Sequence, residues 1–189
     1  MSPMQRGESM KTALSLVAVA TLLIAPNLSA VQSAAPEPIV LPGIQGSAGE
    51  LSSAVQLYID RGDELSTHLR FGAAARQYAQ AADVARGEGH LPSWTSWKMA
   101  NAQYNAGNLV GAAAGMDQLA TDAALVGDLE VEALAIYYAA WLDGKAGRKV
   151  ETAARVVRLE GLLRSRYMPV AIRARLSGLL KSSREVAFQ

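Results

Sequence analysis

Apolar residues recur every three or four positions along most of this chain, with polar residues between them. This spacing follows the ~3.6-residue turn of an α-helix and predicts helices with one apolar face each. Glycine, proline or asparagine interrupts the pattern at intervals and indicates turns. No segment alternates with period two for long enough to predict a strand, so the expected fold class is all-α. The expected helices cover residues 51–68, 72–86, 94–106, 109–125, 129–142, 150–164 and 168 to about 184.

The turns pair the first six helices into three helical hairpins. Turns inside the hairpins are expected near Arg70, Gly107 and Gly147, which are 37 and 40 residues apart. Repeats of this length are typical of helical solenoids, in which each hairpin buries its apolar face on the next. We therefore expect residues 51–189 to form a right-handed solenoid of three helical hairpins plus a C-terminal capping helix.

The first hairpin carries matched small residues. Ala74 and Ala81 lie on one helical face with Tyr78 between them, because they are spaced by four and three residues. On the preceding helix, Gly62 costs about 1 kcal/mol relative to alanine, a cost that close helix contact would explain. We expect Ala74 and Ala81 to face the first helix near Gly62.

This alternation of large and small positions resembles a tetratricopeptide repeat array over about residues 51–164. The first hairpin has arginine at position 61, where the family prefers leucine, and lacks the usual turn glycine. The second hairpin matches with a one-residue slip, and the third matches least. The resemblance implies a groove, lined by the first helices of the hairpins, that holds a protein or peptide. The matching residues are Tyr58, Gly62, Leu65, Ala74, Tyr78 and Ala81, then Trp97, Ala100, Tyr104, Gly107 and Ala112, then Ile136, Ala139, Ala140 and Gly147.

Residues 1–35 are expected to form a secretory signal peptide. Arg6 and Lys11 precede an apolar run over residues 12–25, and small residues follow, with candidate cleavage sites after Ala30 and Ala35. The apolar run is shorter than the ~20 residues of a membrane-spanning helix, although an uncleaved membrane anchor is the alternative. Residues 36–50, rich in proline and glycine, are expected to be a tether. The predicted address is periplasmic or extracellular.

Composition changes this picture in two ways. The chain has no cysteine, so neither a lipid-modified cysteine nor a disulfide is available and packing alone must hold the fold. The net charge of +1 hides an asymmetry, because acidic residues dominate residues 31–144 and basic residues dominate 145–189. A dipolar chain of this kind can attract a polyanion at one end or stack head to tail.

The sequence offers little for catalysis or metal binding. Nucleophilic catalysis needs an activated serine or cysteine beside a histidine base, and the two histidines, His68 and His90, are expected near helix ends. Asp60, Asp63 and Glu64 form an acidic cluster that is more typical of a solvated helix face than of a metal site. We therefore expect no catalysis, cofactor or metal.

Candidate partner-binding residues lie along the third expected helix. Two helical registers remain open. In one register Trp97 and Tyr104 belong to the core between helices, and in the other they face the groove together with Asn101. Burial is the more usual place for large aromatic residues. The candidates are Trp94, Trp97, Asn101, Tyr104 and Asn105.

Basic residues of the C-terminal part form a second candidate surface. A solvated polar helix face is the alternative interpretation, since charge stripes on surface helices are common. Glu151 stands four residues before one of these arginines, a spacing that allows a local ion pair. The candidate residues are Arg148, Arg155, Arg158 and Arg173, with Arg175, Lys181 and Arg184 behind them.

Together these patterns predict an exported, non-catalytic repeat domain of the cell envelope. It would hold a protein or peptide partner, possibly an acidic one, as a scaffold or assembly factor. The alternative function is binding of a polyanion, such as anionic lipid, polysaccharide or nucleic acid, through the basic C-terminal segment. Binding of that kind falls steeply with salt. The oligomeric state stays open.

Overall fold

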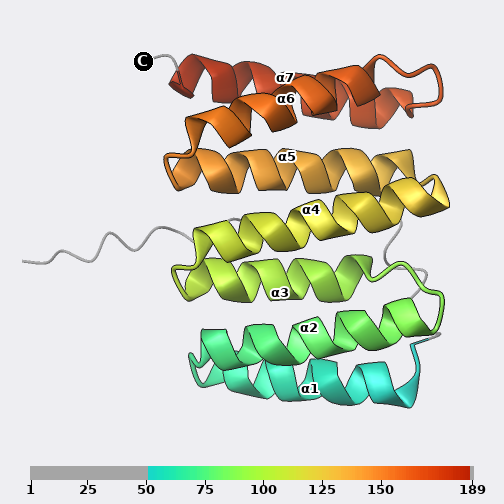
Figure 1. Cartoon of the computed structure of the whole chain (residues 1–189), viewed down its shortest axis with the longest axis vertical. Coiled ribbons are helices and arrows are strands. Elements are labelled where there is room, and N and C mark those ends of the chain that lie inside the picture. Colours follow the sequence, from blue (N-terminus) through green and yellow to red (C-terminus); the bar gives the residue numbers. More distant parts are fainter. Residues whose placement is uncertain (1–50, 188–189) are drawn as a thin grey trace, which may run out of the picture. The chain divides into compact units, whose positions relative to one another are not determined.

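Seven α-helices make up the regular structure of residues 51–187, which are the residues that the computed structural model describes, with side chains to Lys181. The predicted all-α class is confirmed over this range, and each expected helix is present with its ends within three residues of the prediction. The predicted signal peptide (1–35) and tether (36–50) lie outside the described residues, as does the side chain of Arg184. The helices are α1 (Ser53–Thr67), α2 (Phe71–Gly87), α3 (Ser93–Asn105), α4 (Leu109–Val126), α5 (Leu129–Lys145), α6 (Lys149–Leu163) and α7 (Val170–Ala187) (Figure 1).

Side-chain caps fix where three of the helices begin. The side chains of Ser52, Asn108 and Asp128 accept hydrogen bonds from the backbone N–H three residues ahead, at 3.2, 3.0 and 3.0 Å. These bonds satisfy amide groups that have no partner within the first helical turn. Turn residues of the sequence therefore set the starts of α1, α4 and α5.

The connections between successive helices from α1 to α6 each contain one residue with a left-handed φ, which is a glycine at positions 89 and 127 as well. Gly107 and Gly147 adopt a left-handed φ of 77° and 74°, and Leu69 adopts a φ of 57° at the corresponding place between α1 and α2. A left-handed conformation strains a residue that has a Cβ atom and suits glycine. The first turn has no glycine, and Leu69 adopts there the left-handed conformation that glycine adopts at the corresponding positions.

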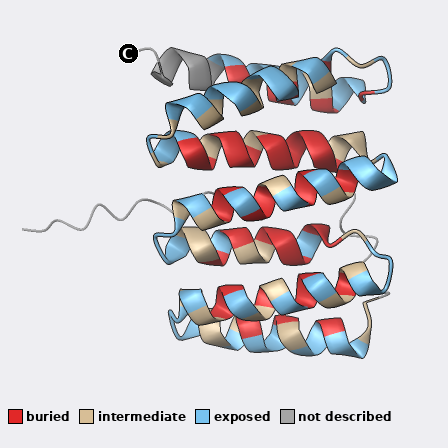
Figure 2. Ribbon diagram, in the orientation of Figure 1, coloured by how far each residue is buried: buried red, intermediate tan, exposed pale blue. Residues whose placement is uncertain are grey.

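Helices that are neighbours in the chain pack on one another from α1 to α6, and α7 packs on α5 and α6. The largest hydrophobic cluster spans α3 to α7, while two small clusters join α1 with α2 and α2 with α3. Helix α5 is apolar around most of its circumference, and Figure 2 shows it as the most continuously buried helix. A helix that is apolar all round must be covered on all sides, so α5 is the centre of the core.

Polar and aromatic contacts also connect helices two apart in the chain. Lys98 of α3 reaches Asp63 of α1, and Trp97 of α3 meets Tyr138 of α5. On the even-numbered helices, Arg86 of α2 pairs with Asp122 of α4, and Arg155 of α6 pairs with Asp117 of α4. The odd-numbered helices α1, α3 and α5 are therefore linked to one another, as are the even-numbered helices α2, α4 and α6.

The close contact expected at Gly62 exists, and the ring of Tyr78 fills it. A Cβ atom at position 62 would lie 2.4 Å from the ring of Tyr78, so the tyrosine, rather than the alanines beside it, occupies the space that glycine leaves. Ala81 packs with Val55 and Ile59 of α1. An aromatic ring reaches farther than a methyl group, which explains why the large residue fills the gap.

Candidate functional site

The outward face of α3 carries four side chains in one line. Trp94, Lys98, Asn101 and Asn105 are spaced by four, three and four residues, so they share a helical face. Trp94 is 42% exposed, and both asparagines are exposed. We call these four residues the α3 stripe. It presents one large aromatic ring and two amides to solvent.

Lys98 holds the N-terminal half of the α3 stripe in place. Its Nζ lies 2.7 Å from Oδ1 of Asp63 on α1. The same ammonium group lies 5.0 Å from the ring centre of Trp94 and 5.4 Å from that of Tyr78. Cations attract aromatic faces at such distances, so the exposed indole rests against a side chain that is itself anchored to α1.

Tyr78 completes this junction from α2. Its hydroxyl donates to Oδ1 of Asp63 at 2.6 Å and lies 3.3 Å from Oγ of Ser66. Burial, followed by the hydrogen bond to Asp63, raises the pKa of Tyr78 to about 12. The hydroxyl therefore stays protonated as a donor, and three helices meet at a single carboxylate.

The two remaining aromatic candidates turn away from the α3 stripe toward α5. Trp97 is only 9% exposed and packs on Tyr138 at 4.6 Å between ring centres. Tyr104 is half-buried against Trp141 at 5.5 Å, and Lys145 covers the Trp141 ring at 5.1 Å. Of the two registers that the sequence left open, the buried one describes Trp97 and the solvent-facing one describes Asn101. Trp97 lies in the core, as the first register predicts, while Asn101 faces solvent. Partner binding by these residues stays a prediction.

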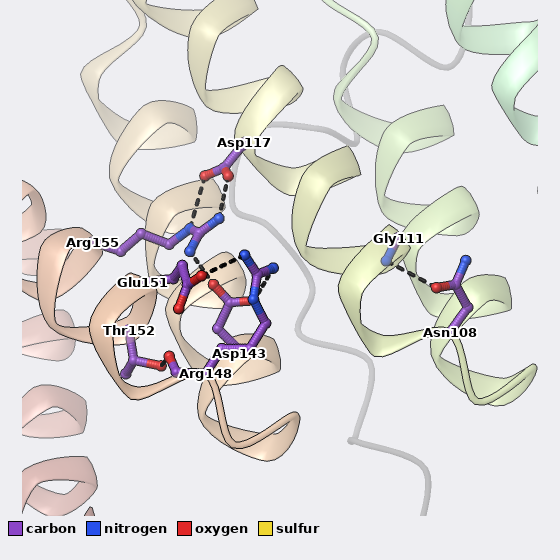
Figure 3. A network of polar contacts seen from close by, with 8 residues as sticks. All are labelled: Asn108, Gly111, Asp117, Asp143, Arg148, Glu151, Thr152 and Arg155. Atoms are coloured by element: carbon purple, nitrogen blue, oxygen red, sulfur yellow. Dashed lines mark hydrogen bonds and ion pairs between the residues drawn. The ribbon is translucent and has the colours of Figure 1, made fainter.

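Arginines of the predicted basic face contact carboxylates of the same chain. Arg155 of α6 binds Asp117 of α4 through two nitrogen atoms, and a third nitrogen contacts Asp143 of α5 (Figure 3). Arg148 also reaches Asp143, at 3.2 Å, and Glu151 at 2.8 Å. Asp143 is fully buried, so both arginines compensate a charge that water does not reach.

Arg158 also pairs with a carboxylate, whereas Arg173 donates to backbone oxygens. Arg158 lies 2.7 Å from Oε1 of Glu132, and Arg173 donates to the backbone oxygens of Ser165 and Met168 at 2.8 and 3.2 Å. All four guanidinium groups of the basic face thus have oxygen partners within the chain. This is the arrangement that a structural role requires, and a role in partner binding stays a prediction.

The other candidate groups of the sequence are dispersed. His68 and His90 are exposed at helix ends. In the acidic cluster of α1, Asp60 accepts a hydrogen bond from Gln56 at 2.7 Å and Asp63 serves the junction with Lys98. Within residues 51–187 no group of three or more histidine or carboxylate side chains is placed to hold a metal ion. No helix in the same range has the length and apolarity needed to cross a membrane.

Sequence reasoning missed the polar junctions at Asp63 and Asp143. A usable signal existed in the spacing of opposite charges. The partners Lys98 and Asp63 are 35 residues apart, and the pairs Arg86–Asp122 and Arg155–Asp117 are 36 and 38 apart. These separations are close to the predicted repeat length of 37 to 40 residues, at which opposite charges on corresponding helices would meet.

Comparison of the chain with protein-family models, curated proteins and solved structures gives no match. The likeness to tetratricopeptide repeats therefore rests on the quoted residues alone and stays a prediction.

Proposed function

We propose that the helices form a right-handed solenoid of tetratricopeptide-like hairpins that binds a protein partner without catalysis, as a scaffold or assembly factor of the cell envelope. The proposal is supported by the recurring left-handed turn residue at positions 69, 89, 107, 127 and 147. It is also supported by ion pairs whose partners lie about one repeat apart. In such an array the odd-numbered helices share one surface, and this surface includes the α3 stripe.

The observation that carries the proposal is an exposed tryptophan held beside two exposed asparagines. Each asparagine side chain offers both donors and an acceptor, which suits the amide groups of an extended segment. Tryptophan is favoured at binding hot spots. Because Lys98 already fixes the Trp94 ring, little side-chain freedom is lost on binding. An extended segment of a protein partner is the ligand that this chemistry suits.

The proposed setting of the protein is the cell envelope. This proposal rests on residues 1–35, in which basic residues precede an apolar run and small residues follow it. Intact-mass measurement of protein from the native host should show loss of about 30 to 35 residues. A mature cytoplasmic protein that begins at Met1 would contradict export and leave the binding proposal standing.

The binding proposal is tested with a peptide selected from a random library on the immobilised protein. Trp94→Ala and the double variant Asn101→Ala with Asn105→Ala should each weaken that peptide about tenfold or more, mainly through faster dissociation. Gln80→Ala changes an exposed amide of α2, on the even-numbered helices, and should leave the affinity unchanged. Wild-type affinity in both α3 variants, at unchanged melting temperature, would exclude the α3 stripe.

A further inference from the structure

An open hollow of about 700 Å³ lies where the connections between successive hairpins come together. The turn between α2 and α3 contributes His90 and Leu91, and the turn between α4 and α5 contributes Val126 and Asp128. The first turn of α5 adds Glu130, and Tyr167 comes from the connection between α6 and α7. None of these residues belongs to the α3 stripe, so the hollow is a separate surface feature.

The rim of the hollow exposes large apolar side chains. Val126 is 63% exposed and Tyr167 is 68% exposed. Leu125 and Val170, each within one residue of a lining residue, are exposed as well. Exposed apolar groups that gather around a concave surface are typical of binding sites. This rim favours a ligand with apolar groups of its own.

A carboxylate without sufficient partners lines the same hollow. Oε1 of Glu130 is buried and has no hydrogen-bond partner, although the residue as a whole is partly exposed. Burial, and secondarily the nearby charge of Asp128, raises the pKa of Glu130, while Arg175 of α7 acts in the opposite direction. Leaving a buried carboxylate oxygen unpaired is costly. A cation brought into the hollow would supply the missing compensation.

The charge around Glu130 selects against an anion. The amide end of a helix dipole attracts negative charge, but the start of α5 already carries Asp128, Glu130 and Glu132. Asp128 caps the helix by accepting from the amide of Val131 at 3.0 Å. The dipole of α5 is thus already opposed by carboxylates of this chain, and an additional anion in the hollow would meet the like charges of Asp128 and Glu130.

We propose that the hollow receives a lysine or arginine side chain of a protein segment, with the cation at Glu130 and the neighbouring apolar side chains on Leu91, Val126 and Tyr167. The site takes a basic, apolar segment and is independent of the amide-rich α3 stripe. Arg175 opposes the entering cation from α7. His90 lines the hollow from the turn between α2 and α3.

The test is a titration of the 15N-labelled protein with acetyl-Leu-Lys-Leu-amide, followed by amide chemical shifts. A matched peptide with norleucine in place of lysine keeps the four side-chain carbons and lacks the charged ammonium group. The lysine peptide should shift the amides of Gly89, Gly127 and Tyr167 with a dissociation constant in the millimolar range. Glu130→Gln should weaken this binding about tenfold, because a charge-assisted contact is lost. Arg175→Gln should strengthen it.

Controls separate this site from the α3 stripe. Glu64→Gln changes an exposed carboxylate of α1 and should bind the lysine peptide like the wild type, as should Asn101→Ala. Absence of shifts at the hollow up to about 10 mM peptide would overturn the proposal. Equal binding of the norleucine peptide, or undiminished binding by Glu130→Gln, would overturn it too. If Glu130→Gln does not fold, the norleucine comparison and Arg175→Gln decide the outcome.

Discussion

Two buried tyrosines, Tyr78 and Tyr138, face opposite situations at their hydroxyl groups. The hydroxyl of Tyr78 donates to Asp63 and lies beside Ser66, whereas the hydroxyl of Tyr138 is buried without a hydrogen-bond partner. Both residues lie within the core. Replacement by phenylalanine is therefore expected to change the free energy of unfolding differently at the two positions.

Replacing Tyr78 by Phe should lower the free energy of unfolding by about 1.5 to 3 kcal/mol, since a hydrogen bond to a charged group is lost. Tyr138→Phe should cause no loss and is expected to stabilise slightly, because it removes an unpaired buried hydroxyl. Urea unfolding of both variants measures the difference. A larger loss in Tyr138→Phe than in Tyr78→Phe would contradict the hydrogen-bond assignment.

The raised pKa of Tyr78 makes stability depend on alkaline pH. Its pKa is about 12 in the folded chain against an ordinary value of 10.0. The folded state thus holds this proton more tightly, and the contribution to stability is complete below pH ~10 and is lost as pH rises toward 12. Between pH 8 and about 11 the wild type should lose more unfolding free energy in urea than Tyr78→Phe. Equal losses would show that Tyr78 has an ordinary pKa.

At the scale of single elements, the sequence was a sufficient guide to the helices. Periodic apolar residues and the turn residues Asn108, Gly127 and Asp128 lie close together in the chain, and local rules connect them directly to helix ends. The sequence did not determine whether Trp97 is buried, because two registers differing by one residue place it on different faces of the helix. Its burial depends on Tyr138, 41 residues away, which local periodicity does not specify.

Leu69 stands in the turn between α1 and α2 in a conformation that strains a leucine. It adopts the left-handed conformation that glycine adopts in the other two hairpin turns, and it is 74% exposed, so little apolar burial would be lost on its removal. Leu69→Gly should raise the unfolding free energy by about 1 kcal/mol through relief of backbone strain. Gly107→Leu should lower it by a similar amount. Thermal unfolding that ranks the two variants in the opposite order would rule out a shared turn conformation.

At the scale of the whole molecule, part of the charge asymmetry of the sequence is used in ion pairs within the chain. Arginines from the basic C-terminal part compensate Asp117, Glu132 and Asp143 of the acidic part. Composition suggested attraction to an external polyanion, because it carries no information on which opposite charges meet within the fold. Separations near the predicted repeat length between oppositely charged residues were the one available sign in the sequence. They indicate ion pairs only once it is known which helices pack together.

Arg155 is the residue on which this pairing depends most. It joins α6 to both α4 and α5, and its loss leaves the fully buried Asp143 with Arg148 alone. Arg155→Ala should therefore lower the unfolding free energy by about 3 to 5 kcal/mol. Arg164, which is highly exposed and lies 3.9 Å from Glu160, is the matched control, and Arg164→Ala should cost less than about 0.5 kcal/mol. Equal stability of the two variants in urea would show that the network contributes nothing.

The central claim is that the α3 stripe, on the odd-numbered helices, meets another protein. Its most direct test places a photo-cross-linking amino acid at position 101 of α3 and, separately, at position 80 of α2, and irradiates the native host. Both positions are exposed. A cross-link to a second protein that forms from position 101 and not from position 80 is the predicted result. A cross-link that forms only from position 80, or none from position 101 while the protein is folded and at its native level, would contradict the claim.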